Sequence, residues 1–255
     1  MRFASLGSGS RGNSLLVEIG RTRLLVDAGF GPAEMSRRLA RLGVVPADID
    51  AVLVTHEHSD HIGGVAACAR RFGWSVRLTH GTLAAWRERG GDMAATLIDS
   101  HEPFSIGDIS VHPFPVPHDA REPVQFVFSD GDRRLGVLTD AGHVTPFMVS
   151  MLDGCDALVL ECNHDVAMLE EGPYLEALKR RIGGRWGHLD NGAAASLLAQ
   201  IERKSLHHVI AAHLSEKNNT PALARSALAA VLQCEPEWVG IATQASGLDW
   251  RDVLN

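Results

Sequence analysis

Apolar and polar positions alternate in short segments along the first part of the chain, and this pattern predicts strands joined by glycine-containing turns. We expect the first strands at three such segments, which are Arg2–Leu6, Leu15–Ile19 and Arg23–Asp27. A helix is predicted over Pro32–Leu42, because its apolar residues recur at helical spacing while arginines occupy the other face. The segment Ala51–Thr55 is apolar up to its final threonine, which is typical of a strand buried on both faces.

Strand and helix patterns continue through the rest of the chain. Further strands are expected at Val76–Thr79, Ile109–Phe114, Gln125–Ser129, Leu135–Thr139, Ala157–Glu161, His208–Ala212 and Trp238–Ala242. Further helices are expected at Gly63–Phe72, Thr145–Leu152, Tyr174–Ile182, Ala193–Ile201 and Ala222–Leu232. Strands that meander early and then alternate with helices in both halves predict an α/β fold. Its two sheets lie face to face with helices outside, in a four-layered αββα sandwich.

The composition excludes several classes of protein. The 255 residues are 45% hydrophobic and 22% charged, which is an ordinary globular composition, and we expect one domain over residues 1–255. No apolar segment approaches the roughly 20 residues that a membrane span needs. The N-terminal segment lacks the apolar core of a secretory signal, and the four cysteines form no CxxC pair. We therefore expect reduced thiols, a cytoplasmic location and no membrane partner.

The strongest chemical signal is the segment His56-Glu57-His58-Ser59-Asp60-His61, which directly follows a predicted buried strand. The first two histidines are spaced so that both can reach one ion from a loop, while Asp60 and His61 can serve a second ion. Imidazole and carboxylate groups suit zinc, iron or manganese. Open α/β sheets place their sites at the carboxyl ends of strands, where this segment lies.

His56-x-His58-x-Asp60-His61 resembles the signature of the metallo-β-lactamase superfamily, whose members have an αββα sandwich with a one- or two-metal site at one edge of the sheets. The resemblance implies one ion held by His56, His58 and His118, another held by Asp60, His61 and His213, and a bridge between them from Asp140. It also implies that Asp27, at the end of an early strand, orients the histidine loop through hydrogen bonds. From the residues alone, Asp27 could equally open a turn before a glycine.

A second histidine segment favours phosphodiester chemistry within this superfamily. Gly187-His188-Leu189-Asp190-Asn191 leads into a helix of small residues and resembles a segment of the phosphodiesterase and nuclease branch. In that branch the histidine approaches the scissile phosphate, as a ligand to its oxygen or as an acid to the leaving group. We therefore predict His188 and Asp60 as the catalytic residues, with an exposed loop histidine as the alternative for His188. Asp190 replaces a small hydroxyl residue of the branch, so the phosphate contact of that residue is not carried over.

Three further segments, residues 8–14, 161–165 and 213–221, together resemble the YycJ/WalJ group of DNA 5′→3′ exonuclease-like proteins. The resemblance implies substrate contacts from Ser10, Asn13, His164, Asn218 and Asn219. Side-chain and backbone donors in such loops suit phosphate oxygens. Without the resemblance, the same segments could be a hairpin turn, a polar turn and a loop that enters a helix.

The formal net charge of −7 argues against a protein that coats nucleic acid, because such binding rests on basic surface. It does not argue against gripping one strand end, since basic residues gather just before His188, at Lys179, Arg180, Arg181 and Arg185. The stretch between Asp140 and His213 is too short for the large inserted domain of the RNA-processing branch. This route to RNA specificity is therefore disfavoured, and the choice between DNA and RNA stays open from these residues.

The expected function is metal-dependent phosphodiester hydrolysis, as a 5′→3′ DNA exonuclease that uses a hydroxide bridging two divalent metals. Zinc is the metal that the ligand types favour, with manganese or iron as alternatives. A small or cyclic phosphodiester is the second candidate substrate. A thioesterase and a non-catalytic metal-binding protein are the remaining alternatives.

Overall fold

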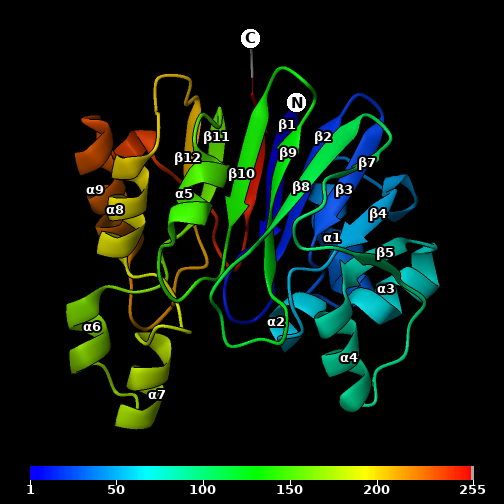
Figure 1. The fold of residues 1–255 in the computed structure, drawn as a ribbon, viewed down its shortest axis with the longest axis horizontal. Helices are drawn as coiled ribbons and strands as arrows, with labels where there is room; N and C mark the ends of the chain where they lie inside the picture. Colours follow the sequence, from blue (N-terminus) through cyan, green and yellow to red (C-terminus); the bar gives the residue numbers. More distant parts are fainter. Residues whose placement is uncertain (254–255) are drawn as a thin grey trace.

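The computed structural model describes residues 1–253 and contains two seven-stranded sheets that pack face to face (Figure 1). The first sheet has the order β14-β1-β2-β3-β4-β5-β6 and the second has the order β13-β12-β11-β10-β9-β8-β7. The first comprises β1 (Arg2–Gly7), β2 (Ser14–Ile19), β3 (Thr22–Val26), β4 (Ala51–Leu53), β5 (Ser75–Thr79), β6 (Thr96–Ile98) and β14 (Leu248–Asp252). The second comprises β7 (Phe104–Ile106), β8 (Ile109–Pro115), β9 (Val124–Ser129), β10 (Arg134–Leu138), β11 (Ala157–Glu161), β12 (His208–Ala212) and β13 (Gly240–Ile241).

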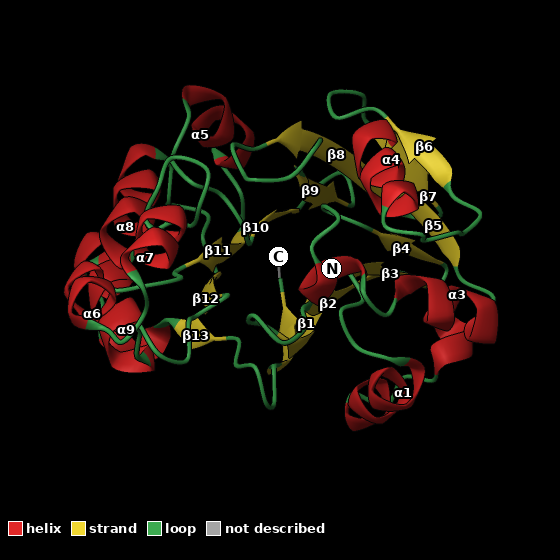
Figure 2. Ribbon diagram, turned by 90° about the horizontal axis from the view of Figure 1, so that it is seen from below, coloured by secondary structure: helices red, strands yellow, loops and turns green. Residues whose placement is uncertain are grey.

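Helices cover the outer face of each sheet (Figure 2). The first sheet carries α1 (Pro32–Arg41), α3 (Val65–Phe72) and α4 (His80–Glu88), and the second carries α5 (Pro146–Leu152), α8 (Asn191–Gln200) and α9 (Pro221–Leu232). Three short helices, α2 (Ser59–Ile62), α6 (Val166–Glu171) and α7 (Glu176–Ile182), lie at the lower edge in Figure 1. Two 3-10 turns complete the elements, η1 (Pro46–Asp48) and η2 (Pro236–Trp238). The predicted αββα sandwich is therefore confirmed.

Three apolar cores separate the four layers. Alternate residues of the strands point to opposite faces, so Val17 of β2 packs between the sheets while its neighbour Leu16 packs under α1. In the second sheet, Val159 of β11 faces the first sheet and Leu160 faces α5 and α8. Because both faces are covered, these strands are apolar throughout, as the segment patterns indicated.

Each sheet changes from antiparallel to parallel pairing along its width, and this change positions the site. β1, β2 and β3 pair antiparallel, whereas β3, β4, β5 and β6 pair parallel. In the second sheet, β7 to β10 are antiparallel and β10 to β13 are parallel. The carboxyl ends of β3, β4, β10, β11 and β12 consequently meet at one edge, the lower edge of Figure 1.

Several element boundaries differ from the predictions. The helix predicted over Gly63–Phe72 begins at Val65, because the two glycines separate it from α2. The strand predicted over Trp238–Ala242 is reduced to β13, since η2 includes its first residue, Trp238. The short elements α4, α6, β6, β7 and β14 were not predicted, and β14 returns to pair antiparallel with β1. Among the helices of residues 1–253, none has the length and apolar character that crossing a bilayer requires.

Candidate metal centre

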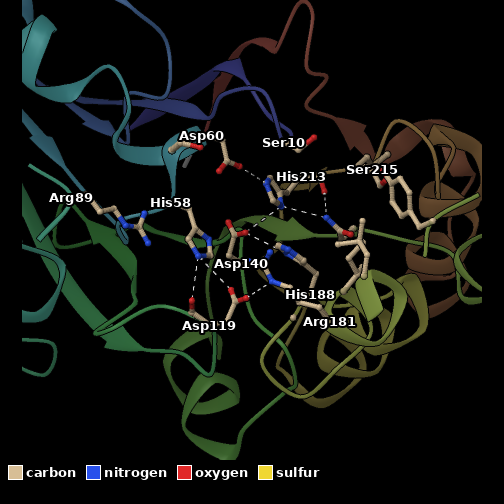
Figure 3. A pocket seen from close by; sticks show the side chains of 17 residues that line it. Ser10, His58, Asp60, Arg89, Asp119, Asp140, Arg181, His188, His213 and Ser215 are labelled. Atoms are coloured by element: carbon tan, nitrogen blue, oxygen red, sulfur yellow. Dashed lines mark hydrogen bonds and ion pairs between the residues drawn. The ribbon is translucent and has the colours of Figure 1, made fainter. Parts of the chain in front are cut away.

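All seven predicted ligands lie at the edge where the parallel strands end, and Figure 3 shows four of them, His58, Asp60, Asp140 and His213. β4 leads into the loop of His56 and His58, and α2 carries Asp60 and His61. The second sheet contributes one residue just after the end of each of three strands, namely His118 after β8, Asp140 after β10 and His213 after β12. Each sheet therefore supplies part of the cluster.

The two predicted ligand sets are present as two compact groups. His56, His58 and His118 bring one ring nitrogen each to within 4.8 Å of one another, and so do the ligand atoms of Asp60, His61 and His213. Asp140 lies between the groups. Its Oδ2 is 3.2 Å from Nε2 of His61, and its Oδ1 is 3.9 Å from Nε2 of His118.

Two buried polar atoms show that these residues fit metal ions. Nε2 of His56 and Oδ2 of Asp140 are buried and have no hydrogen-bond partner among residues 1–253. A buried polar atom without a partner is destabilising, and native structures contain few of them. Both atoms belong to clusters of imidazole and carboxylate groups, which are the donors that zinc, iron and manganese accept in proteins. Divalent cations would satisfy both atoms.

Hydrogen bonds behind the cluster fix how the imidazoles are turned. Oδ2 of Asp27 accepts a bond from Nδ1 of His61 at 2.7 Å, so Nε2 of that ring faces the cluster. Asp27 is itself held by the backbone N–H and the hydroxyl of Thr55, each at 2.8 Å. Nδ1 of His118 donates to the carbonyl of Gly187 at 2.9 Å. Such contacts to the far nitrogen of a ligating histidine orient its ring, and this is the position that the predicted role of Asp27 requires.

The backbone is unusual at two of these residues. Asp27 has φ of 62° and His213 has φ of 53°, both in the left-handed region that side chains rarely occupy. Each residue directly follows the last residue of a parallel strand, β3 for Asp27 and β12 for His213. The turn at this point directs the side chain toward the cluster, and strain of this kind concentrates at functional sites.

The carboxylates of the cluster attract positive charge, while His56 stays neutral. Burial, assisted by neighbouring histidines, lowers the pKa of His56 well below its ordinary value, so the ring is neutral at pH 7, as a ligand must be. Burial favours the neutral form of Asp60, but His61 and His213 outweigh it and hold the pKa of that carboxyl far below its usual range. Burial also lowers the pKa of His213, but Asp140 and two further carboxylates outweigh burial and raise the pKa to about 10. The carboxylates thus attract positive charge to this point.

Glu161 is a member of the site that the sequence analysis did not single out. It is fully buried at the end of β11, and its Oε1 lies 2.7 Å from Nδ1 of His188. Its Oε2 accepts bonds from the backbone N–H groups of Ala141 at 2.8 Å and Leu189 at 3.2 Å. Burial opposes ionisation of Glu161, but His188 and His213 lower the pKa of the carboxyl below its usual range. The sequence contained a signal for Glu161, because a carboxylate at the end of an apolar strand also indicates the edge where the site lies.

Glu161 fixes His188 beside the metal cluster. His188 Nδ1 also lies 3.4 Å from Oδ1 of Asp140, and the ring is close to those of His118 and His213, at 5.2 Å and 5.3 Å between centroids. Burial lowers the pKa of His188, but Glu161 outweighs burial and raises the pKa above the ordinary value. The side chain is 22% exposed and lines the cavity described below. His188 is thus held at its far nitrogen and open to solvent.

Asp119 is a second residue that the sequence analysis left without a role. Its Oδ1 is 3.5 Å from Nε2 of His58 and 3.4 Å from Nε2 of His118. Its Oδ2 accepts a bond from Nε of Arg181 at 2.7 Å. Asp119 therefore connects the first histidine group to α7, as Figure 3 shows.

Two of the five predicted substrate contacts, Ser10 and Asn13, lie at the metal cluster or its cavity. Ser10 is exposed and lines the cavity, in the place that the prediction requires. Asn13 is buried, and its Nδ2 lies 3.2 Å from Oδ2 of Asp60 and 3.1 Å from Nε2 of His61. Asn13 therefore contacts two metal-ligand candidates, while its Oδ1 accepts from the backbone N–H of Gly9.

The remaining three predicted contacts do not line the cavity, so their contact with substrate stays a prediction. His164 and Asn218 are buried, 3% and 0% exposed, and neither lines the cavity. Asn219 uses its side chain internally, in bonds to Asn191 and to the carbonyl of Cys162. The sequence shows that such residues are polar but does not show that their loops turn inward.

The centre opens into a cavity of about 380 Å³ between α2, α7 and the loops that follow β8 and β12. Two cationic groups, Arg89 and Arg181, lie on its walls together with the hydroxyl groups of Ser10 and Ser215 (Figure 3). Tyr174 completes the wall on the side of α7. The cavity thus combines the metal cluster with donors suited to an anionic substrate.

Comparison with known proteins agrees with this geometry. Residues 22–213 match the family described as the beta-lactamase superfamily domain. The chain belongs to the beta-lactamase superfamily. The chain is 36% identical to the exodeoxyribonuclease YycJ of Bacillus anthracis, over 98% of this chain and 96% of that protein. It is 35% identical to the exodeoxyribonuclease WalJ of Streptococcus pneumoniae, over 88% and 85% of the two chains.

A solved structure supports the fold independently. The metallo-beta-lactamase fold protein YhfI of Bacillus subtilis has a TM-score of 0.73 with this superfamily member, at 16% identity, over 98% of this chain and 99% of that one. The predicted resemblance to the metallo-β-lactamase superfamily and to the YycJ/WalJ group is confirmed. The superfamily member is accordingly a metal-dependent hydrolase.

Proposed function

We propose that this superfamily member hydrolyses phosphodiester bonds at DNA ends, as a 5′→3′ exonuclease that works with two divalent ions, zinc by ligand preference. The observation that carries the proposal is His188, which Glu161 holds beside the metal cluster at the wall of a cavity with cationic groups. The names of YycJ and WalJ as exodeoxyribonucleases support the choice of DNA.

The residues divide the work as follows. His56, His58 and His118 would hold one ion, Asp60, His61 and His213 would hold the other, and Asp140 would contact both, as its distances to His61 and His118 support. When bound, such ions make water a nucleophile near neutral pH and stabilise the charge that develops on a phosphate. Asp27 and Thr55 keep the second group of ligands turned inward.

His188 would supply a proton to the leaving oxygen. Its Nδ1 is bonded to Glu161, so Nε2 is the nitrogen left for the substrate. The negative charge of Glu161 favours the protonated ring, which is the form that a general acid needs. Arg89 and Arg181 would hold non-bridging oxygens of the substrate, since a guanidinium group matches the geometry of phosphate.

The test is a nuclease assay on end-labelled DNA and RNA with zinc or manganese, comparing wild type with His188→Ala, Asp60→Ala and the distant control His112→Ala. We expect His188→Ala to slow DNA cleavage by roughly a hundredfold or more while the metal content stays unchanged, because loss of an acid catalyst costs that much. Asp60→Ala should lower both metal content and activity.

Three results would overturn the proposal. One is turnover of a cyclic or aryl phosphodiester with no cleavage of DNA, and another is loss of metal from His188→Ala. The third is the absence of any hydrolysis by the metal-loaded wild type, which would favour a non-catalytic metal-binding protein.

A further inference from the structure

Trp186 is a large aromatic side chain that the fold does not bury. It is 61% exposed, although it lies in the loop that follows α7 and directly precedes two residues that line the cavity, Gly187 and His188. A tryptophan normally buries most of its apolar surface, so one left in solvent beside an active-site cavity points to a binding role.

The loop that carries Trp186 is held rigidly. The backbone N–H of Gly187 donates to the carbonyl of Gly184 at 2.9 Å, and that of His188 donates to Ile182 at 2.8 Å. Nδ1 of His143 donates to the carbonyl of Arg185 at 2.9 Å, and its ring stands edge-on to the indole, with centroids 6.5 Å apart at 82°. The backbone on both sides of Trp186 is therefore hydrogen-bonded, and the ring of His143 contacts the exposed indole.

Exposed arginines precede the exposed ring along the chain. Arg180 and Arg185 are both exposed, and in the part of the chain that the structure describes neither forms an ion pair with a carboxylate. Arg181 itself lines the cavity, where it contacts Asp119. An aromatic ring beside unpaired guanidinium groups is the combination that binds single-stranded nucleic acid, in which bases stack and phosphates pair with cations.

We propose that Trp186 is the stacking platform for one base of the DNA strand whose phosphate enters the metal cavity, with Arg180 and Arg185 contacting the adjoining phosphates. This inference rests on the proposed function and assigns it a strand path, from the metal cluster past His188 and out over α7. The base contacts the ring face and not a hydrogen-bonding group, so the site accepts any sequence.

The experiment measures KM and kcat on single-stranded oligodeoxynucleotides for wild type, Trp186→Ala, Trp186→Phe and the control Trp238→Ala. Trp238 is also exposed, at 43%, but it lies in η2, outside the cavity wall. We expect Trp186→Ala to raise KM about tenfold with kcat nearly unchanged, the size of effect that stacking of one base gives, while Trp186→Phe and Trp238→Ala stay close to wild type.

A series of oligonucleotides, each with one abasic position, locates the stacked base. In wild type one abasic position should raise KM by the same factor as the variant, and Trp186→Ala should be insensitive to that position. An unchanged KM for Trp186→Ala, or equal sensitivity of both proteins to every abasic position, overturns the inference. Sedimentation gives a further outcome that overturns the inference. In it, wild type is a dimer, Trp186→Ala is a monomer, and KM changes only at protein concentrations too low for the dimer to form. The ring would then be a subunit contact.

The two proposals fail separately. If wild type cleaves no DNA, the proposed function is wrong, whereas cleavage of DNA without an effect of Trp186→Ala removes the stacking platform alone. Fluorescence anisotropy with a labelled oligonucleotide that carries phosphorothioate linkages reports binding without turnover. Equal affinity of wild type and Trp186→Ala in that measurement contradicts the inference directly.

Discussion

Replacing Asp27 by asparagine tests how the metal-ligand loop is held. The two side chains have the same shape, and asparagine tolerates the left-handed backbone that Asp27 adopts at φ 62°, so the change acts on the carboxylate alone. Both oxygens face donors in the native structure. Oδ1 accepts from the backbone N–H of Thr55, and Oδ2 accepts from Nδ1 of His61 and from the Thr55 hydroxyl.

An asparagine must place its NH2 group at one of these two positions, and each position already faces an N–H group. Next to Thr55 the amide would meet a backbone donor. Next to His61 the amide would force the proton of the ring from Nδ1 to Nε2. The nitrogen that faces the metal cluster would then carry a proton and could not bind a metal ion. The charge-assisted bond to His61 is worth about 1.5–3 kcal/mol, and a factor of ten in affinity corresponds to about 1.4 kcal/mol. We expect metal affinity to fall about 10- to 100-fold, in line with other residues that orient ligands.

The assay is competition for zinc against a fluorescent chelator, with stoichiometry from elemental analysis and thermal unfolding of the metal-free protein as a folding check. Asp249→Asn is the matched control, because Asp249 is 78% exposed and pairs with Arg41 on the surface. Unchanged zinc affinity and stoichiometry in a folded Asp27→Asn protein would refute the orienting role of Asp27.

Three further changes have defined outcomes. Glu161→Gln should lower kcat on a phosphodiester about tenfold or more while zinc is retained, because the charged bond to His188, the proposed acid, is lost; full activity would contradict this. Gly29→Ala should destabilise the protein by about 1–3 kcal/mol in urea unfolding, since its Cβ would overlap the backbone carbonyl of Asp60, whereas Gly31→Ala meets nothing within 4 Å and should be neutral. Glu18 is bound by two arginines that outweigh its burial and lower its pKa, so its contribution is complete above the unfolded-state pKa of about 4.3 and is lost as the pH falls through the lower folded value. Glu18→Gln should therefore weaken the dependence of the urea midpoint on pH between about 3 and 5, and an unaltered dependence would count against the ion pairs.

The apolar segments predicted most of the sheet strands, because strands covered on both faces must be apolar throughout. Ala157–Glu161 and His208–Ala212 were predicted with the bounds that the structure gives. β14 was missed because Leu248–Asp252 is an edge strand of mixed polarity, whose pairing with β1 depends on contacts across the whole chain. Short edge elements carry little local signal, since their stability comes from the neighbour and not from their own pattern.

The clustering of the candidate ligands could be predicted from the sequence because each one follows a recognisable strand or lies in one dense motif. Glu161 escaped notice, although it is the last residue of β11, and Asp140 and His213 follow within two residues of the ends of their own strands. The inward turn of Asn218 and Asn219 could not be predicted, because burial of a loop residue depends on what packs over it. Polarity alone therefore separates a binding loop from a structural one poorly.

The ligands come from both sheets, and this division makes the centre a measure of how the sheets are docked. His56 to His61 are tied to the first sheet, and Asp140, Glu161 and His213 to the second. The apolar layer between the sheets sets their separation, with Phe126 fully buried within it. A substitution that opens a cavity in this layer would alter the distance between the candidate ligands of the first sheet and those of the second. Conversely, a cation bound across them would act as a cross-link between the sheets, so its removal should loosen the sandwich as a whole.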